Sequence, residues 1–234
     1  MTSSAPFSSP AAQANLEALA HRAIALVAPG KRIIIGIAGS PGAGKTTIAR
    51  QVADLITAAS NTAGAAPAAV YLPMDGYHLA NATLDRLGSR HRKGAIDTFD
   101  GWGFLSLMKR VRSEIGHPVY APGFDRSVDE GIAGEIAVEA GTPIVIVEGN
   151  YLLVDEEPWR GLRALFSESW FCETSDAVRL RRLVDRHEKH GRTRDAAYDW
   201  AVNVDGANAR IIEASRVRAD LLVSGIDGSF REVG

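Results

Sequence analysis

Cysteine is almost absent from this chain of 234 residues, in which Cys172 is the single example. One cysteine excludes an intramolecular disulfide framework and a cysteine-based zinc site. Long apolar runs are also missing, since none approaches the roughly 20 residues that a membrane-spanning helix needs. The first ten residues are rich in Ser, Pro and Ala and contain no basic residue, which is unlike a signal peptide. We therefore expect a cytoplasmic protein with no membrane partner.

The chain also lacks a large excess of charge and a high aromatic content. Its formal net charge is −2 at pH 7, and aromatic residues make up 7% of it. Neither a basic surface nor a stacking platform for bases is indicated, so we expect no nucleic-acid partner. The remaining composition, 46% hydrophobic and 23% charged, is that of an ordinary globular protein. We expect a disordered tail over residues 1–10, which are poor in apolar side chains, and one domain over 11–234.

Short β-branched runs alternate with amphipathic segments, which is typical of an α/β fold with a parallel sheet covered on both faces. Residues 31–38 (KRIIIGIA) and 143–148 (PIVIVE) have the continuous apolar character of strands buried on both faces. A weak alternation at 132–138 predicts a hairpin strand, and the polar stretch 76–100 predicts loops and short helix. Further strands are expected at 69–74, 169–174 and 220–223, and helices at 15–28, 46–59, 102–115, 176–190 and 196–218, the last broken near Gly206.

The strongest motif runs from Gly39 to Thr46 and matches G-x-x-x-x-G-K-[ST] between an expected strand and an expected helix. Its glycines allow backbone N–H groups to turn inward around an anion, and the helix N-terminus adds positive potential. Lys45 would reach the β- and γ-phosphates, the Thr46 hydroxyl would ligate Mg²⁺, and Thr47 would contact the α-phosphate. A plain strand-to-helix turn is the much less favoured alternative. The residues assigned to the nucleotide are Gly39, Ser40, Gly42, Ala43, Gly44, Lys45, Thr46 and Thr47.

A phosphate cradle does not by itself identify the reaction, but the rest of the chain reduces the number of candidate reactions. A GTPase needs an N-K-x-D guanine reader, but the sequence contains no Asn-Lys pair. A transporter-type ATPase needs two adjacent acids after its second acidic strand, whereas here Glu148 is followed by Gly149. A small-molecule kinase needs a base near the acceptor hydroxyl, an acid near the metal and a mobile basic lid. All three have candidates in this chain.

Two acids come directly after expected strands, where ligands bind in open α/β folds. Asp75 follows the strand at 69–74 and would accept the proton of an attacking hydroxyl. Glu148 ends the strand at 143–148 and would hold Mg²⁺ or a metal-bound water. The alternatives are that Asp75 merely caps the next turn, beside Gly76, and that Glu148 is a surface acid.

Residues 179–194 are unusually basic and form the candidate lid. Arg182 and Arg186 share one helix face with Arg179, and Gly191 offers a hinge. Guanidinium groups that close over a transferring phosphoryl group stabilise its charge and exclude water. The alternative is a solvated basic face paired with nearby acids. The basic residues are Arg179, Arg181, Arg182, Arg186, Lys189, Arg192 and Arg194.

Several strings occur in a characteristic order along the chain. They are the cradle at 39–46, MDGYH at 74–78, KGA at 93–95, DTFD at 97–100, the stretch 120–126, VEGNY at 147–151 and the arginine-rich stretch 182–192. This set resembles the uridine kinase, pantothenate kinase and phosphoribulokinase superfamily of P-loop kinases. Within it, the chain is most similar to bacterial fructose transport system kinase-like, or nucleoside kinase-like, proteins. The resemblance extends from about residue 31 to residue 223.

The resemblance implies a P-loop NTPase fold with a five-stranded parallel sheet, ATP with Mg²⁺, and a small hydroxyl compound as acceptor. Asp75 matches the family's catalytic acid and Glu148 the acid after the third core strand. Arg182 and Arg186 match lid arginines, and which of them faces the γ-phosphate stays open. With Lys45, these give the catalytic set. The stretches that shape the acceptor pocket in such kinases contain Tyr77, His78, Arg92, Lys93, Phe124, Asp125 and Arg126.

Two functions follow as hypotheses. The first is an ATP-dependent kinase that phosphorylates a hydroxyl of a sugar such as fructose, a nucleoside or a pantothenate-like compound. The second is a nucleotide-binding regulatory ATPase module associated with a sugar transport system, which needs no acceptor. No sequence feature reads a particular sugar or base. Many relatives form oligomers, so a homodimer is compatible with the resemblance.

Overall fold

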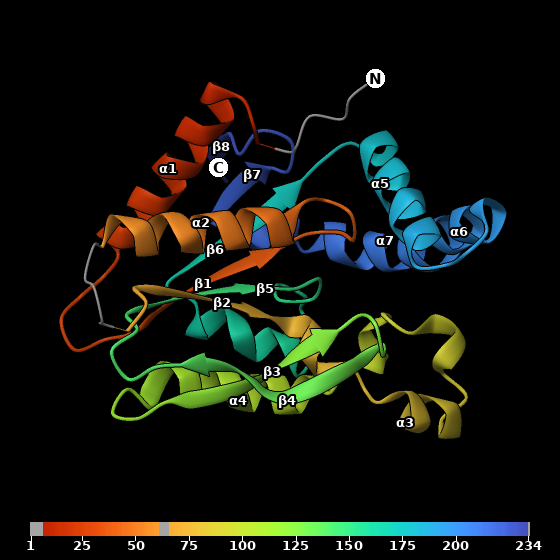
Figure 1. The fold of residues 1–234 in the computed structure, drawn as a ribbon, viewed down its shortest axis with the longest axis horizontal. Coiled ribbons are helices and arrows are strands. Elements are labelled where there is room, and N and C mark those ends of the chain that lie inside the picture. Colours follow the sequence, from red (N-terminus) through yellow and green to blue (C-terminus); the bar gives the residue numbers. More distant parts are fainter. Residues whose placement is uncertain (1–6, 61–65, 234) are drawn as a thin grey trace.

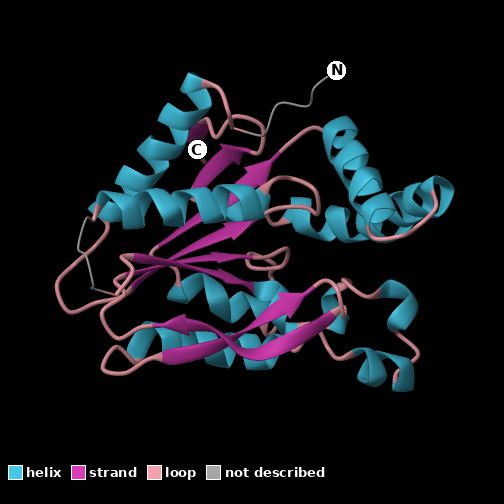
Figure 2. Ribbon diagram, viewed as in Figure 1, coloured by secondary structure: helices cyan, strands magenta, loops and turns pink. Residues whose placement is uncertain are grey.

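A six-stranded sheet forms the centre of the computed structural model, which describes residues 7–60 and 66–233 (Figure 2). The strand order is β2-β5-β1-β6-β7-β8, with the first five parallel and β8 antiparallel to β7. The predicted five-stranded parallel sheet is confirmed. The additional edge strand β8 is too short and polar to give a sequence signal. The strands are β1 Ile33–Ala38, β2 Ala69–Pro73, β5 Ile144–Glu148, β6 Glu168–Glu173, β7 Leu221–Ser224 and β8 Phe230–Glu232.

Helices cover both faces of this sheet (Figure 1). Successive residues of β1 point to opposite faces, so Ile35 packs beneath α1 and α2 while Ile34 packs on the side of α4. Every residue of β1 is therefore buried, which explains its unbroken apolar sequence. The helices are α1 Pro10–Ala25, α2 Lys45–Ala59, α3 Asn81–Arg86, α4 Gly101–Ser113, α5 Asp176–Lys189, α6 Arg194–Trp200 and α7 Gly206–Ala214.

The remaining elements are short or stand apart from the sheet. A separate hairpin is formed by β3, Val119–Asp125, and β4, Glu130–Val138. The predicted strand 132–138 is part of it. The predicted break near Gly206 is a π-helical turn, Ala201–Asp205, between α6 and α7. Short 3₁₀ turns lie at Met74–Tyr77, Arg90–Arg92, Ile96–Thr98, Trp159–Leu165 and Arg216–Arg218.

Residues 7–10, the described part of the predicted tail, pack against the domain or begin its first helix. Residues 1–6 of the predicted tail lie outside the described residues. Phe7, however, is buried in the core under α1 and α2, and the Ser9 hydroxyl caps α1 by accepting from the Ala12 N–H at 3.2 Å. The helix begins at Pro10, five residues before the predicted start. Its first turns use alanine, which shows little apolar periodicity, and a proline that fits the first helical position.

In the part of the chain that the structure describes, no helix combines the length and the apolar character that crossing a membrane requires.

A buried arginine, Arg32, connects the end of α4 to the turn between β4 and β5. Arg32 is only 2% exposed. Its guanidinium donates to the carbonyls of Val111 and Glu114 at the end of α4, at 2.9 and 3.2 Å. It also donates to the carbonyls of Thr142 and Glu139 in the β4–β5 turn, at 2.9 and 2.7 Å. Burial lowers the pKa of Arg32, and these four carbonyls compensate for the lost hydration.

We expect Arg32→Leu to lower the free energy of unfolding by about 3 kcal/mol, because it leaves buried carbonyls without donors and removes charged hydrogen bonds. Urea unfolding followed by circular dichroism measures the loss. Arg181→Leu, at an exposed position on α5, is the control and should change stability by less than about 0.5 kcal/mol. Equal stability of the two variants would show that the Arg32 cluster stabilises nothing.

Candidate active site

The loop between β1 and α2 has the backbone of a phosphate cradle. Gly39 and Gly44 have φ angles of +144° and +116°, which favour glycine. A Cβ on Gly39 would lie 2.4 Å from the Cys172 carbonyl oxygen, and one on Gly44 would lie 2.9 Å from that of Gly225. Gly44 also precedes α2 without a side-chain cap, so the helix N-terminus is open to an anion. Loop shape and helix position thus both suit a phosphate.

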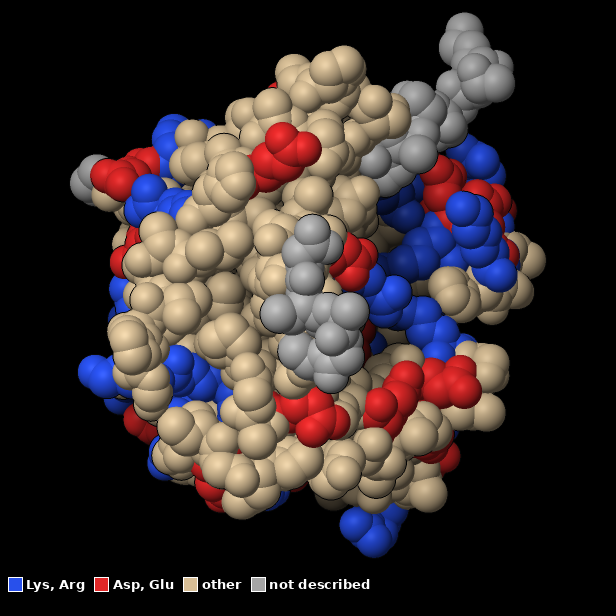
Figure 3. Space-filling view, turned by 60° about the vertical axis from the view of Figure 1, so that its left-hand side comes forward, with Lys and Arg blue, Asp and Glu red and all other residues tan. Residues whose placement is uncertain are grey.

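A cavity of about 880 Å³ opens from this cradle along the carboxyl edge of the sheet. Figure 3 shows Lys and Arg side chains gathered around a hollow on the right of the view. On the right of Figure 1, α5, α6 and α7 lie above this edge, and α3 with the tip of the hairpin lies below it. The cavity therefore joins three parts of the chain that are distant in sequence.

The cradle residues divide between the cavity and the core. Ser40 does not line the cavity, and its hydroxyl donates to Glu213 on α7 at 2.5 Å. Gly39 and Ala43 also lie outside the lining, where they pack the loop onto its neighbours. The predicted nucleotide residues that line the cavity are Gly42, Gly44, Lys45, Thr46 and Thr47.

Glu148 lies at the centre of the site because of the strand register. It pairs with Ile37 of β1 on one side and with Pro73 of β2 on the other. Glu148 is only 5% exposed, so the alternative that it is a surface acid is wrong. Its Oε1 accepts from the Thr46 hydroxyl at 3.0 Å and from the Tyr71 hydroxyl at 2.9 Å.

The cradle lysine and this acid share one buried environment. Burial raises the pKa of Glu148 and lowers that of Lys45, which is 6% exposed. Burial thus opposes the negative charge of Glu148 and the positive charge of Lys45. A bound cation would offset the first charge, and a triphosphate would offset the second. The carboxylate and the Thr46 hydroxyl are hard oxygen donors, which fit Mg²⁺ held by few protein groups together with substrate phosphates.

Sequence reasoning missed Tyr71. It lies four residues before Asp75 on β2, and burial together with the neighbouring Glu148 charge raises its pKa. A tyrosine within a strand is ordinary, so only its contact with Glu148 reveals its part in the site.

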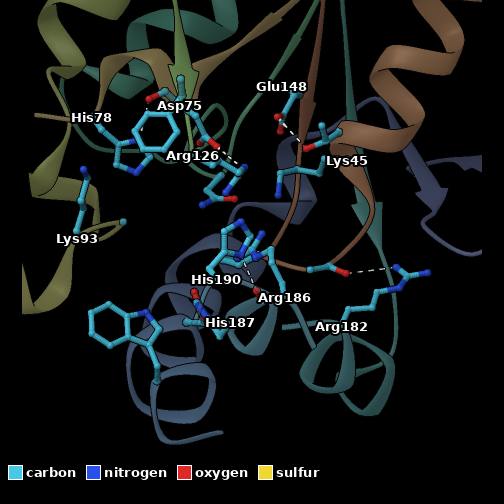
Figure 4. A pocket seen from close by; sticks show the side chains of 18 of the residues that line it. Lys45, Asp75, His78, Lys93, Arg126, Glu148, Arg182, Arg186, His187 and His190 are labelled. Carbon is cyan, nitrogen blue, oxygen red and sulfur yellow. Dashed lines mark hydrogen bonds and ion pairs between the residues drawn. The ribbon is translucent and has the colours of Figure 1, made fainter. Parts of the chain in front are cut away.

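Asp75 lies in the 3₁₀ turn that follows β2, and its side chain faces the cavity. Arg126 of the hairpin donates to its Oδ2 at 3.1 Å (Figure 4). Among the described residues, this arginine is the only hydrogen-bond partner of the carboxylate. The alternative in which Asp75 caps the next turn therefore has no support in the geometry.

Two glycines set how closely the hairpin approaches this turn. A Cβ on Gly76 would lie 2.2 Å from the Pro122 carbonyl oxygen, and one on Gly131 would lie 2.7 Å from that of Gly76. These distances are far below ordinary contact, so the backbones meet only because side chains are missing. The close approach brings Arg126 to Asp75.

Four of the predicted acceptor residues line the cavity: His78, Lys93, Phe124 and Arg126. The His78 ring lies 4.8 Å from the Phe124 ring, centroid to centroid. The Lys93 ammonium donates to Asn81 at 2.7 Å and to the Asp129 carboxylate at 3.0 Å. Lys93 thus connects α3 to the hairpin turn, and its donors are engaged within the protein.

Three predicted acceptor residues do not line the cavity, and this corrects their assignment. Tyr77 points to the core, where it packs edge-on against Phe104 at 5.3 Å. Arg92 forms an ion pair with Asp97. Asp125 accepts from both the backbone and the hydroxyl of Ser127 at 2.7 Å. Each of the three is next in the sequence to a residue that does line the cavity.

The two candidate lid arginines lie in different environments. Arg182 donates to the carbonyls of Ala43 and Gly225, both at 3.0 Å, and so joins α5 to the cradle and to the turn after β7. Arg186 faces the cavity, and its guanidinium has no hydrogen-bond partner within residues 7–60 and 66–233 (Figure 4). Burial lowers the pKa of Arg186. Arg186 is therefore the arginine available to a ligand.

Comparisons with known proteins identify the family of this chain. The model of the "Phosphoribulokinase / Uridine kinase family" matches residues 34–228. The chain belongs to this family. The predicted resemblance is thereby confirmed, and with it a P-loop kinase that uses ATP and a small-molecule substrate.

The matches to individual relatives cover most of the length of this chain. "Putative uridine kinase C227.14" of Schizosaccharomyces pombe is 30% identical over 88% of both chains. "Uncharacterized protein YggC" of Escherichia coli is 31% identical over 86% of this chain and 81% of its own. The crystal structure of a "putative fructose transport system kinase" from Silicibacter sp. TM1040 has 39% identity and a TM-score of 0.79, covering 88% of this chain and 97% of that one. This chain therefore shares its fold with that solved structure.

We expect Tyr71→Phe to raise the Mg²⁺ concentration needed for half-maximal ATP turnover about tenfold or more, because groups that orient a ligating carboxylate matter this much. The measurement is a Mg²⁺ titration at saturating ATP. Tyr120→Phe, at an exposed position of the hairpin, is the matched control. An unchanged Mg²⁺ requirement in Tyr71→Phe would show that Tyr71 does not contribute to Mg²⁺ binding.

Proposed function

We propose that this chain is an ATP-dependent phosphotransferase that phosphorylates a hydroxyl of a small metabolite, such as a sugar like fructose, a nucleoside or a pantothenate-like compound. The observation that carries the proposal is the content of one cavity. It is lined by the cradle with Lys45, by Glu148 and by Asp75. A donor phosphate and an acceptor hydroxyl would meet within this space.

The donor end would hold ATP through the cradle N–H groups, the α2 N-terminus and Lys45. Thr46 and Glu148 would hold Mg²⁺, which when bound neutralises charge on the phosphate oxygens. Tyr71 would keep the Glu148 carboxylate in place through the hydrogen bond already present. A phosphate beside the buried lysine would add its negative charge to that of Glu148, which favours a charged nucleotide over neutral compounds.

At the acceptor end, Asp75 would take the proton of the attacking hydroxyl. Arg126 now occupies one of its oxygens and orients the carboxylate toward the cavity. Arg186 faces the same space from α5. Negative charge that develops on the transferring group would therefore lie between the guanidinium groups of Arg126 and Arg186. Arg182 would act indirectly, by holding the cradle against α5 and Gly225.

The acceptor end also bears on the rival function. A regulatory ATPase module does not need the part of the cavity beside Asp75 that His78, Phe124 and Arg126 line. The test is ATP consumption with a panel of sugars, nucleosides and pantothenate. Stimulated ADP release, with a gain of one phosphate in the mass of the added compound, supports the kinase. Slow hydrolysis that ignores every compound supports the regulatory module.

We expect Asp75→Asn to bind ATP normally and to lose about 10²- to 10⁴-fold in phosphoryl transfer, because a general base contributes that much. ATP affinity by calorimetry and product formation by mass spectrometry give the two measurements. Asp54→Asn, at an exposed position on α2, serves as the control. Transfer at the wild-type rate in Asp75→Asn would reject the base assignment.

The two arginines should respond differently to methionine. We expect Arg186→Met to lower kcat about 10²- to 10³-fold with little change in ATP affinity, because it removes charge stabilisation in the transition state. Arg182→Met should instead weaken ATP binding about tenfold, since it releases the carbonyls of Ala43 in the cradle and Gly225 in the turn after β7. Steady-state kinetics and ATP titration separate these effects. The reverse pattern would exchange the two roles.

A further inference from the structure

An aromatic residue from the segment before α1 reaches the cavity. Phe7 lines the same cavity as the phosphate cradle. It is 7% exposed and belongs to the core cluster that packs α1 and α2 against the sheet. The family model begins at residue 34, so neither this segment nor α1 lies in the region that it matches. The place of Phe7 in the cavity is therefore a feature of this chain that the family match does not explain.

The turn after β7 connects this segment to the cradle. The Asn15 side chain of α1 donates to the Asp227 carbonyl in that turn at 3.0 Å, and α1 lies beside β7 and β8 (Figure 1). The same turn touches the cradle, since a Cβ on Gly44 would lie 2.9 Å from the Gly225 carbonyl oxygen. Phe7 precedes α1 by three residues, so it enters the cavity from the side of this turn.

The base of a nucleotide would lie on this side of the cradle. In the proposed function the γ-phosphate faces Asp75 and Thr47 contacts the α-phosphate. The nucleoside is attached to the α-phosphate, so it must leave the cradle in the direction away from Asp75. A base needs apolar surface there, because its two faces are poorly hydrated.

Few apolar side chains offer such a surface. Phe124 belongs to the hairpin that brings Arg126 to Asp75, and Trp200 ends α6, so neither is part of the cradle or of the segment that adjoins it. Phe7 is therefore the aromatic ring on the nucleoside side. In the part of the chain that the structure describes, the apolar side chains that line the cavity are Phe7, Pro41, Phe124 and Trp200.

The backbone of Phe7 supports a role in ligand binding. Its φ angle is +65°, in the left-handed region that bulky side chains rarely adopt. Asp129, at +56°, is the one other residue besides glycine with a positive φ among those described, and it also lines the cavity. Aspartate tolerates this conformation, whereas phenylalanine has no polar group to compensate for it. Strained backbone of this kind gathers at ligand sites, where the surrounding structure holds it in place.

We propose that Phe7 forms the wall against which the base of the bound nucleotide packs, so that the segment before α1 completes the nucleotide site. This inference rests on the proposed kinase function and names a binding residue for its phosphate donor. Contact between a base and an aromatic ring removes apolar surface of both from water and raises affinity about tenfold or more. Phosphate binding would remain the task of the cradle and Lys45.

The experiment compares two ligands that differ in the base. ATP and inorganic tripolyphosphate, each with Mg²⁺, are titrated into the full-length protein by calorimetry. Tripolyphosphate has the phosphates of ATP but neither its sugar nor its base. We expect Phe7→Ala to weaken ATP binding about 10- to 30-fold, because the base loses its aromatic partner. Tripolyphosphate binding should change less than about twofold, because the cradle is intact.

Further variants separate base contact from core packing. Phe7→Tyr keeps the ring and should bind ATP within about twofold of the wild type. Phe7→Leu keeps an apolar side chain in the core, and it should lose part of the ATP affinity while tripolyphosphate binding stays unchanged. Leu16→Ala is the matched control, because Leu16 belongs to the same core cluster, is 1% exposed and does not line the cavity. It should lower the free energy of unfolding and leave both affinities unchanged.

The outcomes distinguish this inference from the proposed function. The role of Phe7 is overturned if Phe7→Ala binds ATP as the wild type does, if it loses affinity for both ligands equally, or if Leu16→Ala reproduces its selective loss. In each of these cases ATP binding by the wild type and phosphorylation of a compound in the metabolite panel would still support the kinase. A wild type that does not bind ATP rejects both proposals. If Phe7→Ala does not fold, the two titrations on Phe7→Leu decide the question.

Discussion

The site depends on the parallel pairing of β5 with β1 on one side and β2 on the other. In this register Glu148 lies opposite Ile37 and Pro73, so the cradle that follows β1 and the acid that follows β2 emerge at the same edge. A slip of one residue would turn Glu148 to the other face of the sheet and break its bonds to Thr46 and Tyr71. The geometry of the candidate site is in this sense set by strand register.

The rest of the site is attached to that edge by close backbone contacts. Gly76 and Gly131 allow the hairpin to approach the turn after β2, and Gly44 allows the turn after β7 to approach the cradle. Each contact places one arginine: Arg126 beside Asp75, and Arg182 across the cradle. The glycines therefore matter for how near two backbones come as well as for the turns they form.

Burial organises the charges of the cavity into two groups. Lys45, Glu148 and Arg186 have pKa values shifted against their charged forms, and a nucleotide with its metal would restore those charges. Lys93 and Arg182 are instead satisfied by protein oxygens and serve as fixed connections. This division explains why basic residues that look alike in the sequence have different parts in the structure.

Short-range patterns in the sequence were enough to predict the features whose chemistry is local. The cradle at 39–46, the buried strands and the acids that end two of them follow from short-range patterns, and the family follows from their order. The partners could be found only from the fold: Tyr71 at Glu148, Arg126 at Asp75, and the separate surroundings of Arg182 and Arg186. The fold also places Tyr77, Arg92 and Asp125 outside the lining of the cavity. The physical reason is that strand and helix periodicity tells which way a residue points within its own segment, whereas its partner is supplied by a distant segment whose approach depends on packing.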